Sequence, residues 1–415
     1  MIVVGGGIAG LLTSYFLSSK GYSVQVITES ETSNTASWMN AGYIAASFGD
    51  PTPAIEGFLN IVRLALSKYS PVKVHVIYFL RNLLPNSWLW MFVKNSQKRN
   101  SPEHFKIVSN LCSKGAQLLQ QIIDSNRLEV FLGKTILEVF LNEKMFKEYV
   151  KHLQKDVGYP KSRPLILTSS ECLELEPMIS ETVVGGVLFE DDAYVDPAEL
   201  MVKLKDFLEN ALGVIFKYGR VDSLETKNKS VISVRLRNGQ VLTASHYVIC
   251  CGVGAAPLLS RLGIRLPLTP ALGYTVITEP HQEKLGRAVY GGEFGLAMSQ
   301  TREGRIRMSG YFELGASPHS VLDKRCQAIK ENASLYLPSV RKLFVAAKRF
   351  GARPCTPDGL PYVGEVGLEN LTVNVGHCRL GLTTGAATAG LICDILEGVK
   401  NPFSEALNPM RMFKV

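Results

Sequence analysis

The sequence of 415 residues has no C-x-x-C pair, and its eight cysteines show no metal-ligand spacing. This absence excludes the common zinc and iron–sulfur motifs, so we predict no metal site. A framework of disulfides is not expected in a chain of this length. Reduced thiols fit a cytoplasmic protein, which is the location that we predict.

Blocks of five or more basic residues are also absent, although the formal net charge is +8. We therefore predict no nucleic-acid partner. Two uncharged stretches, residues 1–19 and 32–49, approach the length of about 18 residues at which a membrane-spanning helix is considered. Three adjacent glycines interrupt the first, and Ser, Thr and Asn enrich the second, so we expect neither to span a membrane.

The composition is that of a folded protein, with 46% hydrophobic and 20% charged residues. At roughly 100–200 residues per domain, the length indicates two or three domains. No internal repeat and no low-complexity linker separates them.

A glycine-rich segment follows a short apolar strand at residues 2–4 and precedes a helical run. Gly5, Gly7 and Gly10 stand in the G-x-G-x-x-G register, with Ile8 and Ala9 between them. Such glycines permit a tight turn, close approach of a pyrophosphate and close helix packing, and the free N–H groups of the helix would face the phosphates. The strand–turn–helix context therefore predicts a dinucleotide site.

The second strand of this unit should end in an acidic residue that binds the ribose hydroxyls, about 20 residues after the glycines. The usual spacing falls on Thr28, and the carboxylate is one position later, at Glu29. We predict that both residues lie at the cofactor and that Glu29 supplies the carboxylate. The fingerprint does not distinguish FAD from NAD, but residues 251–256 lack a third glycine, so only one dinucleotide is expected.

Further along the chain, Ser101 and Pro102 are typical of a helix start, and residues 60–160 are predicted to be mostly helical. Asn238-Gly239 within residues 231–241 indicates a hairpin with a type I′ turn. Apolar runs predict strands at residues 247–250, 274–278, 305–309 and 371–375. This order indicates two interleaved domains.

Several further segments, in order and nearly from end to end, resemble the FAD-dependent D-amino-acid oxidase superfamily, and most closely its D-amino-acid dehydrogenase branch. The resemblance implies an α/β fold, with a Rossmann-type FAD-binding domain interleaved with an α+β substrate domain on an antiparallel or mixed sheet. We place the FAD-binding domain at residues 1–60, 190–262 and 345–415 and the substrate domain at 61–189 and 263–344. The segments that carry it are residues 36–42, 194–197, 247–252, 266–274, 351–361 and 376–383.

The resemblance also implies which residues lie along the flavin. The segment at 376–383 leads into a helix whose positive N-terminal end would suit the edge of the ring that gains negative charge on reduction. We expect His377 to pack beside the cofactor rather than act as a base, and attachment of the flavin to a cysteine is left open. The predicted flavin contacts are Ser37, Asn40, Ala41, Gly42, Gly252, Gly376, His377, Arg379, Leu380, Gly381, Leu382 and Thr383.

Arg353 matches the carboxylate-binding arginine of the family. Its planar guanidinium would hold a substrate carboxylate through two hydrogen bonds and so orient the Cα–H toward the ring. The hydroxyls of Tyr43 and Tyr274 are predicted to bind the substrate or close the pocket, although each tyrosine is as readily structural.

The resulting hypothesis is an FAD-dependent dehydrogenase that oxidises an amino or imino acid, such as a D-amino acid or proline, by hydride transfer from Cα to flavin N5. A quinone or dye is the expected electron acceptor. An oxygen-using oxidase of the glycine or sarcosine type is the alternative, and a subunit whose FAD is structural is the alternative of another class. The side chain and chirality of the substrate and the oligomeric state are open.

Residues 58–94 combine apolar runs with scattered basic residues, among them Arg63, Lys68 and Lys94. This pattern is typical of a helix that lies on an anionic membrane surface, and equally of helices packed on the substrate domain. Peripheral contact with the inner face of the cell membrane is therefore a further hypothesis.

Overall fold

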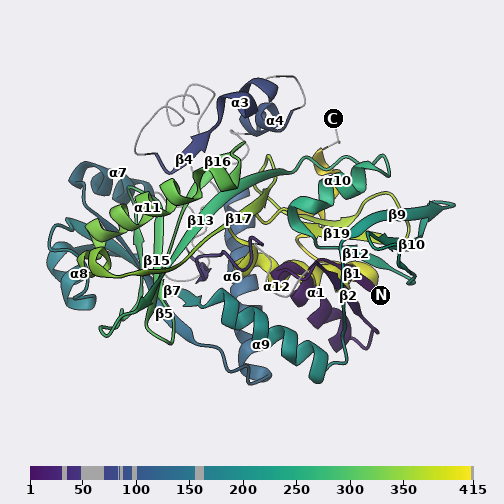
Figure 1. The fold of residues 1–415 in the computed structure, drawn as a ribbon, viewed down its shortest axis with the longest axis horizontal. Coiled ribbons are helices and arrows are strands. Elements are labelled where there is room, and N and C mark those ends of the chain that lie inside the picture. Colours follow the sequence, from purple (N-terminus) through teal and green to yellow (C-terminus); the bar gives the residue numbers. More distant parts are fainter. Residues whose placement is uncertain are drawn as a thin grey trace.

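The computed structural model describes residues 1–29, 35–47, 70–82, 84, 87–95, 101–154 and 163–412. Within these ranges the chain forms a six-stranded sheet near the N-terminus, a ten-stranded sheet in the other half of the molecule, and a small three-stranded sheet (Figure 1). The two large sheets are each built from segments far apart in the sequence. The predicted α/β class with interleaved parts is confirmed.

The six-stranded sheet contains the predicted strand–turn–helix unit. Its strands are parallel except for one antiparallel pair, β18 and β19. The central strands β1, β12 and β19 have every side chain buried, as expected for a sheet covered on both faces. In sheet order the strands are β18 (Tyr362–Glu365), β19 (Leu371–Val375), β12 (Tyr247–Ile249), β1 (Ile2–Val4), β2 (Gln25–Thr28) and β8 (Ile215–Tyr218).

Four helices share one hydrophobic core beside this sheet: α1 (Ile8–Ser19), α6 (Pro102–Ser125), α9 (Pro197–Asn210) and α12 (Gly381–Leu396). Ser101 caps α6 as predicted, because its Oγ accepts a hydrogen bond from the N–H of His104 at 3.2 Å. Helices α6 and α12 approach so closely that a Cβ on Gly115 would lie 2.1 Å from the carbonyl oxygen of Thr383.

The ten-stranded sheet is mixed, as predicted, with most neighbours antiparallel. Helix α11 (Pro318–Tyr336) packs against β13, β16 and β17. The main path runs β17 (Val345–Cys355), β13 (Thr269–Pro280), β16 (Arg305–Leu314), β15 (Leu296–Gln300), β14 (Ala288–Gly291), β5 (Leu132–Phe140), β7 (Gly185–Val195) and β3 (Tyr43–Ile44), while β4 (Val72–Val74) pairs with β16 and β6 (Leu165–Thr168) with β7.

The small sheet contains β9 (Val221–Lys227), β10 (Ser230–Leu236) and β11 (Val241–Leu242). The hairpin between β10 and β11 lies where the sequence predicts it, but the turn type was wrong. A type I′ turn needs positive φ at both central residues, whereas Gly239 has a φ of +88° and Asn238 does not have a positive φ.

The remaining described helices connect these layers. They are α3 (Val76–Arg81), α4 (Trp88–Lys94), α7 (Glu143–Leu153), α8 (Ser169–Leu175), α10 (Ala255–Ser260), α13 (Ser404–Leu407) and short 3-10 turns at Gly252–Gly254, Pro338–Lys342 and Pro409–Met412. Helices α3 and α4 project beyond the edge of the ten-stranded sheet (Figure 1). None of the helices in the described ranges is both long and apolar enough for a membrane crossing.

The structure differs from the predicted domain boundaries and from the predicted helical region at several points. Strand β17 belongs to the ten-stranded sheet, so the return to the nucleotide side follows Cys355 rather than residue 345. Helix α6 packs in the core of the six-stranded sheet although it was placed in the substrate domain. Strand β5 interrupts a region predicted to be mostly helical. The boundary at residue 60 lies outside the described residues.

Candidate active site

The glycine turn between β1 and α1 admits no side chain at two of its three positions. Gly5 has a φ of +117°, and a Cβ there would lie 2.7 Å from the backbone of Cys250. A Cβ on Gly10 would lie 1.8 Å from the carbonyl oxygen of Gly5. The turn therefore brings bare backbone to the N-terminal end of α1, whose first turn has no acidic residue. This cradle fits the pyrophosphate of a dinucleotide.

Gly7 is the N-cap residue of α1, and Ile8 and Ala9 form its first turn. The N–H of Ile8 donates to the Oγ of Ser37 at 3.0 Å, so the segment predicted to lie along the flavin reaches the glycine turn. The structure thus brings Ser37 together with the glycine fingerprint, through a contact with Ile8 that lies 29 positions away in the sequence.

Thr28 and Glu29 occupy different surroundings at the end of β2. A Cβ on Gly6 would lie 2.7 Å from the Oγ1 of Thr28, so the threonine packs against the glycine turn. The side chain of Glu29 is 62% exposed and lies 3.7 Å from Arg220. Binding of the ribose by either residue stays a prediction, and the geometry places Thr28 nearer to the turn.

Residues 35–42 cross from the glycine turn to the ten-stranded sheet. Asn40 closes a local turn, because its Oδ1 accepts the N–H of Gly42 at 2.8 Å. Gly42 has a φ of +89°, and a Cβ there would lie 2.1 Å from the carbonyl oxygen of Val195. The carbonyl oxygen of Ala41 accepts a hydrogen bond from Ser299 at 3.4 Å. The predicted flavin-lining segment is therefore held by its backbone.

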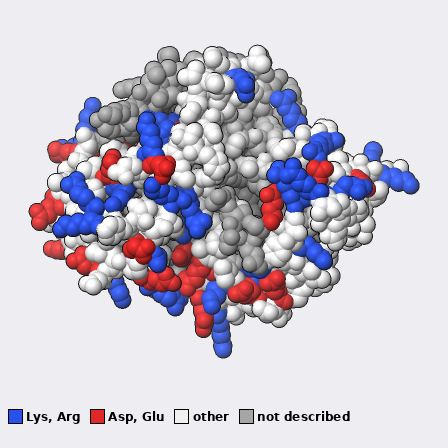
Figure 2. All heavy atoms as spheres, viewed as in Figure 1, with Lys and Arg blue, Asp and Glu red and all other residues white. Residues whose placement is uncertain are grey.

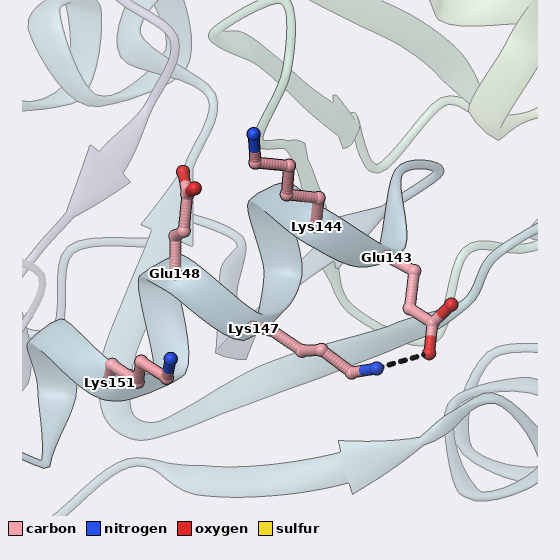
Figure 3. Close-up of a pocket in the computed structure, with 5 residues that line it drawn as sticks. All are labelled: Glu143, Lys144, Lys147, Glu148 and Lys151. Carbon is pink, nitrogen blue, oxygen red and sulfur yellow. Dashed lines mark hydrogen bonds and ion pairs between the residues drawn. The ribbon is translucent and has the colours of Figure 1, made fainter.

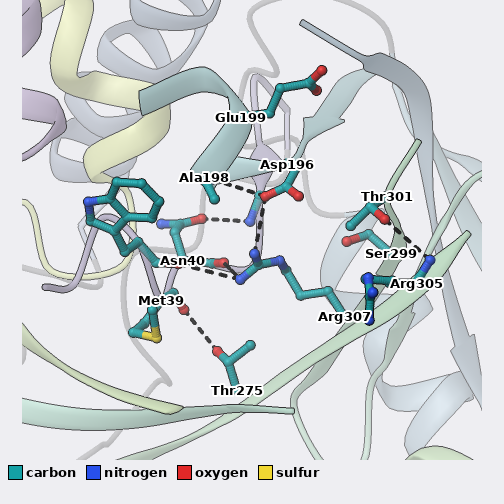
Figure 4. A network of polar contacts seen from close by, with 12 residues as sticks. Met39, Asn40, Asp196, Ala198, Glu199, Thr275, Ser299, Thr301, Arg305 and Arg307 are labelled. Atoms are coloured by element: carbon teal, nitrogen blue, oxygen red, sulfur yellow. Dashed lines mark hydrogen bonds and ion pairs between the residues drawn. The ribbon is translucent and has the colours of Figure 1, made fainter. Parts of the chain in front are cut away.

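Arg307 on β16 is the centre of that attachment (Figure 4). Its guanidinium is buried, pairs with Asp196 at 3.1 Å and donates to the carbonyl oxygens of Trp38 and Asn40 at 3.4 Å. Asp196 also caps α9 by accepting the N–H of Ala198. The ion pair of the buried Arg307 with the partly exposed Asp196 thus joins the large sheet, α9 and residues 38–40. The sequence does not indicate this role of Arg307, because only the folding of β16 into the large sheet brings its side chain to residues 38–40.

The second predicted flavin segment joins β19 to α12. Gly376 has a φ of +92°, and a Cβ there would lie 2.6 Å from the side chain of Thr356. Leu380 is the N-cap residue of α12, which begins at Gly381 and continues through Leu382 and Thr383. The helix thus starts close to its predicted position, and its first turn has no acidic side chain.

Thr383 connects α12 to the first segment, because its Oγ1 accepts the N–H of Ala45 at 3.0 Å. Gly252 has a φ of +56° and follows β12 in a short 3-10 turn, where its Cβ position is 3.8 Å from Pro354. The ends of β1, β12 and β19 and the start of α12 are therefore assembled on one edge of the parallel sheet, which is where such sheets bind ligands.

His377 is buried and its Nε2 lies 3.0 Å from the Oγ1 of Thr388. Burial lowers the pKa of His377 to about 4, so the imidazole is uncharged at neutral pH. This environment agrees with a packing role.

Cys355 and Cys378 form a disulfide, which corrects the expectation of reduced thiols. The two cysteines are 23 residues apart in sequence, and both are buried. They meet because the chain returns through β19 to the end of β17, where the N–H of Cys378 donates to the carbonyl oxygen of Pro354 at 3.0 Å. The six other cysteines are free, and five of these are buried.

Arg353 is partly exposed near the end of β17, next to the disulfide. Its guanidinium lies over Gly273, where a Cβ would come within 2.3 Å, and it donates to the carbonyl oxygen of Tyr311 at 2.6 Å. No carboxylate of the described residues pairs with it. Burial, and then the nearby charge of Arg379, lowers the pKa of Arg353 to about 10, so it remains a cation at neutral pH.

The two predicted tyrosine hydroxyls already have partners. The hydroxyl of Tyr43 donates to the carbonyl oxygen of Val289 at 2.8 Å and accepts from the N–H of Met298 at 3.1 Å. The hydroxyl of Tyr274 is buried and donates to Glu313 at 2.7 Å. Direct contact of either hydroxyl with substrate stays a prediction, and the geometry favours a positioning role for both.

Glu313 is the buried carboxylate of the substrate side. It is fully buried and accepts hydrogen bonds from Arg325, Tyr274 and His75 at distances up to 3.0 Å. Burial alone would raise the pKa of Glu313, but these hydrogen bonds outweigh it and lower that pKa to about 2. The guanidinium of Arg325 also lies over the ring of Tyr311, whose carbonyl oxygen orients Arg353.

A separate shallow pocket lies on α7, away from these residues (Figure 3). Its lining consists of exposed side chains of both charges from one helix, including the ion pair of Lys147 with Glu143 at 2.6 Å. None of the predicted site residues contributes to it, so we place the candidate site at the glycine turn, the 376–383 segment and Arg353.

Known proteins are similar to this chain over nearly its whole length. The chain is 26% identical over 423 residues to a D-amino acid dehydrogenase of Vibrio vulnificus, with 99% of each chain covered. Among solved structures, a glycine oxidase from Geobacillus kaustophilus is similar with a TM-score of 0.74 at 19% identity, covering 99% of this chain and 98% of that one. An L-proline dehydrogenase from P. horikoshii is similar with a TM-score of 0.73 at 16% identity, covering 100% and 97%.

The family model described as FAD dependent oxidoreductase matches residues 1–395. That range includes the glycine turn, the 36–42 segment, Arg353 and the start of α12. The chain belongs to the FAD-dependent oxidoreductase family.

Proposed function

We propose that this protein is a dehydrogenase that oxidises an amino or imino acid. The observation that carries the proposal is Arg353, a cation oriented by a backbone carbonyl at the edge of the predicted flavin site, with no carboxylate partner among the described residues. The names of the similar proteins support this substrate class, because they describe D-amino acid and L-proline dehydrogenases and a glycine oxidase.

Arg353 would bind the carboxylate of the substrate. Its N–H groups not used by Tyr311 remain to donate to two carboxylate oxygens, which fixes the orientation of the Cα–H. Partial burial strengthens this charge-assisted interaction, since less water competes for the guanidinium. The amine would need to be neutral, because a protonated amine carries no lone pair to assist loss of hydride.

When bound, FAD supplies the hydride acceptor of this reaction. The glycine turn at residues 5–10 and Ser37 would hold its phosphate side, and the 376–383 segment with the N-terminus of α12 would lie along the ring. The positive end of α12 would stabilise negative charge there. His377, uncharged at neutral pH, adds no charge of its own to this edge.

A quinone is the electron acceptor that we propose, reached from a membrane surface. Val76, Ile77, Leu80 and Leu84 are between 59% and 71% exposed on and beside α3, and we call these four residues the α3 face. The chain has no acidic residue between Glu56 and Glu103. The surface over α3 and α4 is mostly uncharged, with few basic side chains (Figure 2).

Apolar side chains beside basic residues fit the headgroup region of an anionic bilayer. Among the basic residues of segment 58–94, Lys73, Arg81 and Lys94 lie in the described part of the chain, whereas residues 58–69 lie outside it. His75 contacts Glu313 and Tyr78 contacts Thr269, and these contacts attach α3 to the large sheet. The sheet therefore holds the α3 face in place.

The membrane proposal is tested by flotation of the holoprotein with vesicles of phosphatidylcholine, with and without anionic lipid. We expect binding to the anionic vesicles, lost in Ile77→Asp and Leu80→Asp. Ile232→Asp is a matched control, because Ile232 is 47% exposed on the small sheet. Equal recovery of all three variants with the vesicles would refute the assignment of the α3 face.

The proposed activity is tested by anaerobic bleaching of the bound flavin with a panel of D- and L-amino acids and cyclic imino acids. We expect at least one to reduce the flavin rapidly, and a quinone analogue or dye to restore it faster than oxygen does. Stoichiometric peroxide without dye would instead identify an oxidase. A flavin that no amino or imino acid bleaches would contradict the proposal.

A further inference from the structure

The loop after β17 carries a buried hydroxyl, that of Thr356. This residue is 2% exposed, and within the described part of the chain its Oγ1 has no hydrogen-bond partner. Buried hydroxyls are nearly always paired, because an unpaired one keeps the full cost of its lost hydration. In a protein that binds a cofactor, such a group is a candidate for a hydrogen bond that forms only with the cofactor.

Thr356 lies beside the segment that leads into α12. Its methyl group packs on Gly376, where a Cβ would come within 2.6 Å of it. The preceding residue, Cys355, forms the disulfide with Cys378. Thr356 is therefore attached to the beginning of the segment at 376–383, which is expected to lie along the flavin ring.

Other groups fix the loop that carries Thr356. The Nε1 of Trp88 donates to the carbonyl oxygen of Cys355 at 2.8 Å. Two residues after Thr356, Asp358 is fully buried and pairs with Arg411 at 2.7 Å. Contacts on both sides thus determine the position of the loop, and the hydroxyl of Thr356 takes part in none of them. A donor held in place in this way is preorganised for a ligand.

We propose that Thr356 is a flavin ligand, whose hydroxyl donates a hydrogen bond to an acceptor atom on the polar edge of the isoalloxazine ring. The phosphates are expected elsewhere, at the glycine turn of residues 5–10. A donor to the ring binds reduced flavin more tightly than oxidised flavin, because reduction places negative charge on this edge. Thr356 would thereby contribute both to the affinity for FAD and to its reduction potential.

The first measurement is the dissociation constant of FAD, obtained by diluting the holoprotein and following the fluorescence of released flavin. In Thr356→Val, which keeps the shape and removes the hydroxyl, we expect this constant to rise about tenfold. Thr356→Ser keeps the hydroxyl and should stay within about threefold of the wild type. An unchanged constant in Thr356→Val would overturn the inference and leave a buried water as the partner of the hydroxyl.

Thr278→Val is the matched control, because Thr278 is a fully buried threonine whose hydroxyl is paired within the protein. Its Oγ1 accepts the N–H of Ile306 at 3.0 Å and donates to the carbonyl oxygen of Glu279 at 2.7 Å. The loss of these bonds should lower the melting temperature of apoprotein and holoprotein alike and leave the dissociation constant of FAD unchanged.

Thr356→Val should behave in the opposite way. Its apoprotein should melt at the wild-type temperature or above, since no internal hydrogen bond is lost, and only its holoprotein should melt below the wild type at equal FAD concentration. A fall in the melting temperature of the apoprotein as large as that of Thr278→Val would make the hydroxyl a structural group and overturn the inference.

The spectrum and potential of the bound flavin test the assignment to the ring. Thr356→Val should shift the flavin absorbance and lower the two-electron reduction potential by about 30 mV, which corresponds to a tenfold change in the equilibrium constant. Thr356→Ser should keep both near the wild type. Weaker FAD binding with unchanged absorbance and potential would place the hydroxyl at another part of the cofactor and overturn the assignment. These readouts need only bound flavin, so they are independent of the proposed substrate.

Discussion

The two walls of the candidate site are built in opposite ways. The nucleotide wall is a run of six residues in which missing side chains make the fit, as Gly5 and Gly10 show. The proposed substrate wall consists of polar groups from His75 to Arg353, some buried and some partly exposed, joined by hydrogen bonds across β13, β16, β17 and α11. The first wall depends on the space that its glycines leave. The second depends on the hydrogen bonds around Glu313 and on the one that orients Arg353, which has no carboxylate partner among the described residues. Different substitutions should therefore break each wall.

A disulfide bond joins the two walls. The Cys355–Cys378 disulfide joins the end of β17, which carries Arg353, to the segment that precedes α12. Changes at this point should move both walls together, whereas changes within either wall should leave the other intact.

The largest effect is expected at Gly10. Because its Cβ would lie 1.8 Å from a backbone oxygen, Gly10→Ala should abolish FAD binding. Gly390→Ala is the matched control, since Gly390 also lies in a helix, α12, and its Cβ would come no closer than 3.8 Å to Phe16, an ordinary contact. The measurement is the ratio of bound flavin to protein after purification. A flavin-replete Gly10→Ala protein would contradict the close approach at this turn.

On the substrate wall, Glu313→Gln should destabilise the protein by about 3–5 kcal/mol, because it leaves the Arg325 guanidinium without its buried carboxylate. Thermal unfolding of the holoprotein measures the change. The double variant Glu313→Gln with Arg325→Met should recover part of it. Bound flavin should remain near wild type in protein that stays folded, and its loss would show that the two walls are not independent.

At the covalent junction, Cys355→Ser should lower stability by about 2–4 kcal/mol, as expected for loss of a disulfide that closes a loop of this size. A reductant should lower the melting temperature of the wild type and leave that of the variant unchanged. Cys172→Ser, which changes a free buried cysteine, is the control for the loss of a thiol. If the reductant changes neither protein, the thiols are not joined in solution.

Arg353→Gln should lower kcat/KM by roughly 10- to 100-fold, the value of one or two charge-assisted hydrogen bonds to a carboxylate. The effect should appear mainly in KM, with the flavin still bound. Lys348→Gln, on the exposed part of the same strand, should leave kcat/KM unchanged. An Arg353→Gln enzyme with wild-type KM would remove Arg353 from the substrate wall.

The smallest effect concerns pH. Because burial lowers the pKa of Arg353 to about 10, binding of an inert carboxylate such as butyrate should be constant from pH 7 to 9. It should weaken as pH rises through about 10, since only the protonated guanidinium attracts the anion. Binding titrated by flavin absorbance measures this, and Arg353→Gln should show weak affinity without that decline. If the wild-type protein binds butyrate with the same affinity up to pH 11, the lowered pKa of Arg353 is contradicted.

The nucleotide side of the fold was largely predictable from sequence because its signals are local. The glycine register, strand 371–375 and the Ser101 helix cap each depend on neighbouring residues, and each is present in the structure. The position of Glu29 shows the limit of spacing rules, since one residue separates a side chain packed on the turn from one in solvent.

The substrate wall was less predictable because its contacts join distant residues. Residues 132–140 form strand β5 although the sequence predicts a mostly helical region there. The strands that pair with β5, β7 and β14, lie about 50 and 150 residues away, so no local pattern indicates the pairing. Arg307 and Glu313 look like ordinary charged strand residues until the register buries them. The disulfide has no sequence signal, because only the return of β19 to the end of β17 brings Cys378 to Cys355.

The contact at Gly115 has a consequence for how the chain can be divided. Helix α6 lies between segments of the large sheet in sequence, yet it rests directly on the backbone of α12 and shares its apolar core. A shortened protein made by joining the nucleotide-side segments alone would expose that face of α12 to water. Neither half is therefore expected to be obtained as a well-folded fragment by simple truncation.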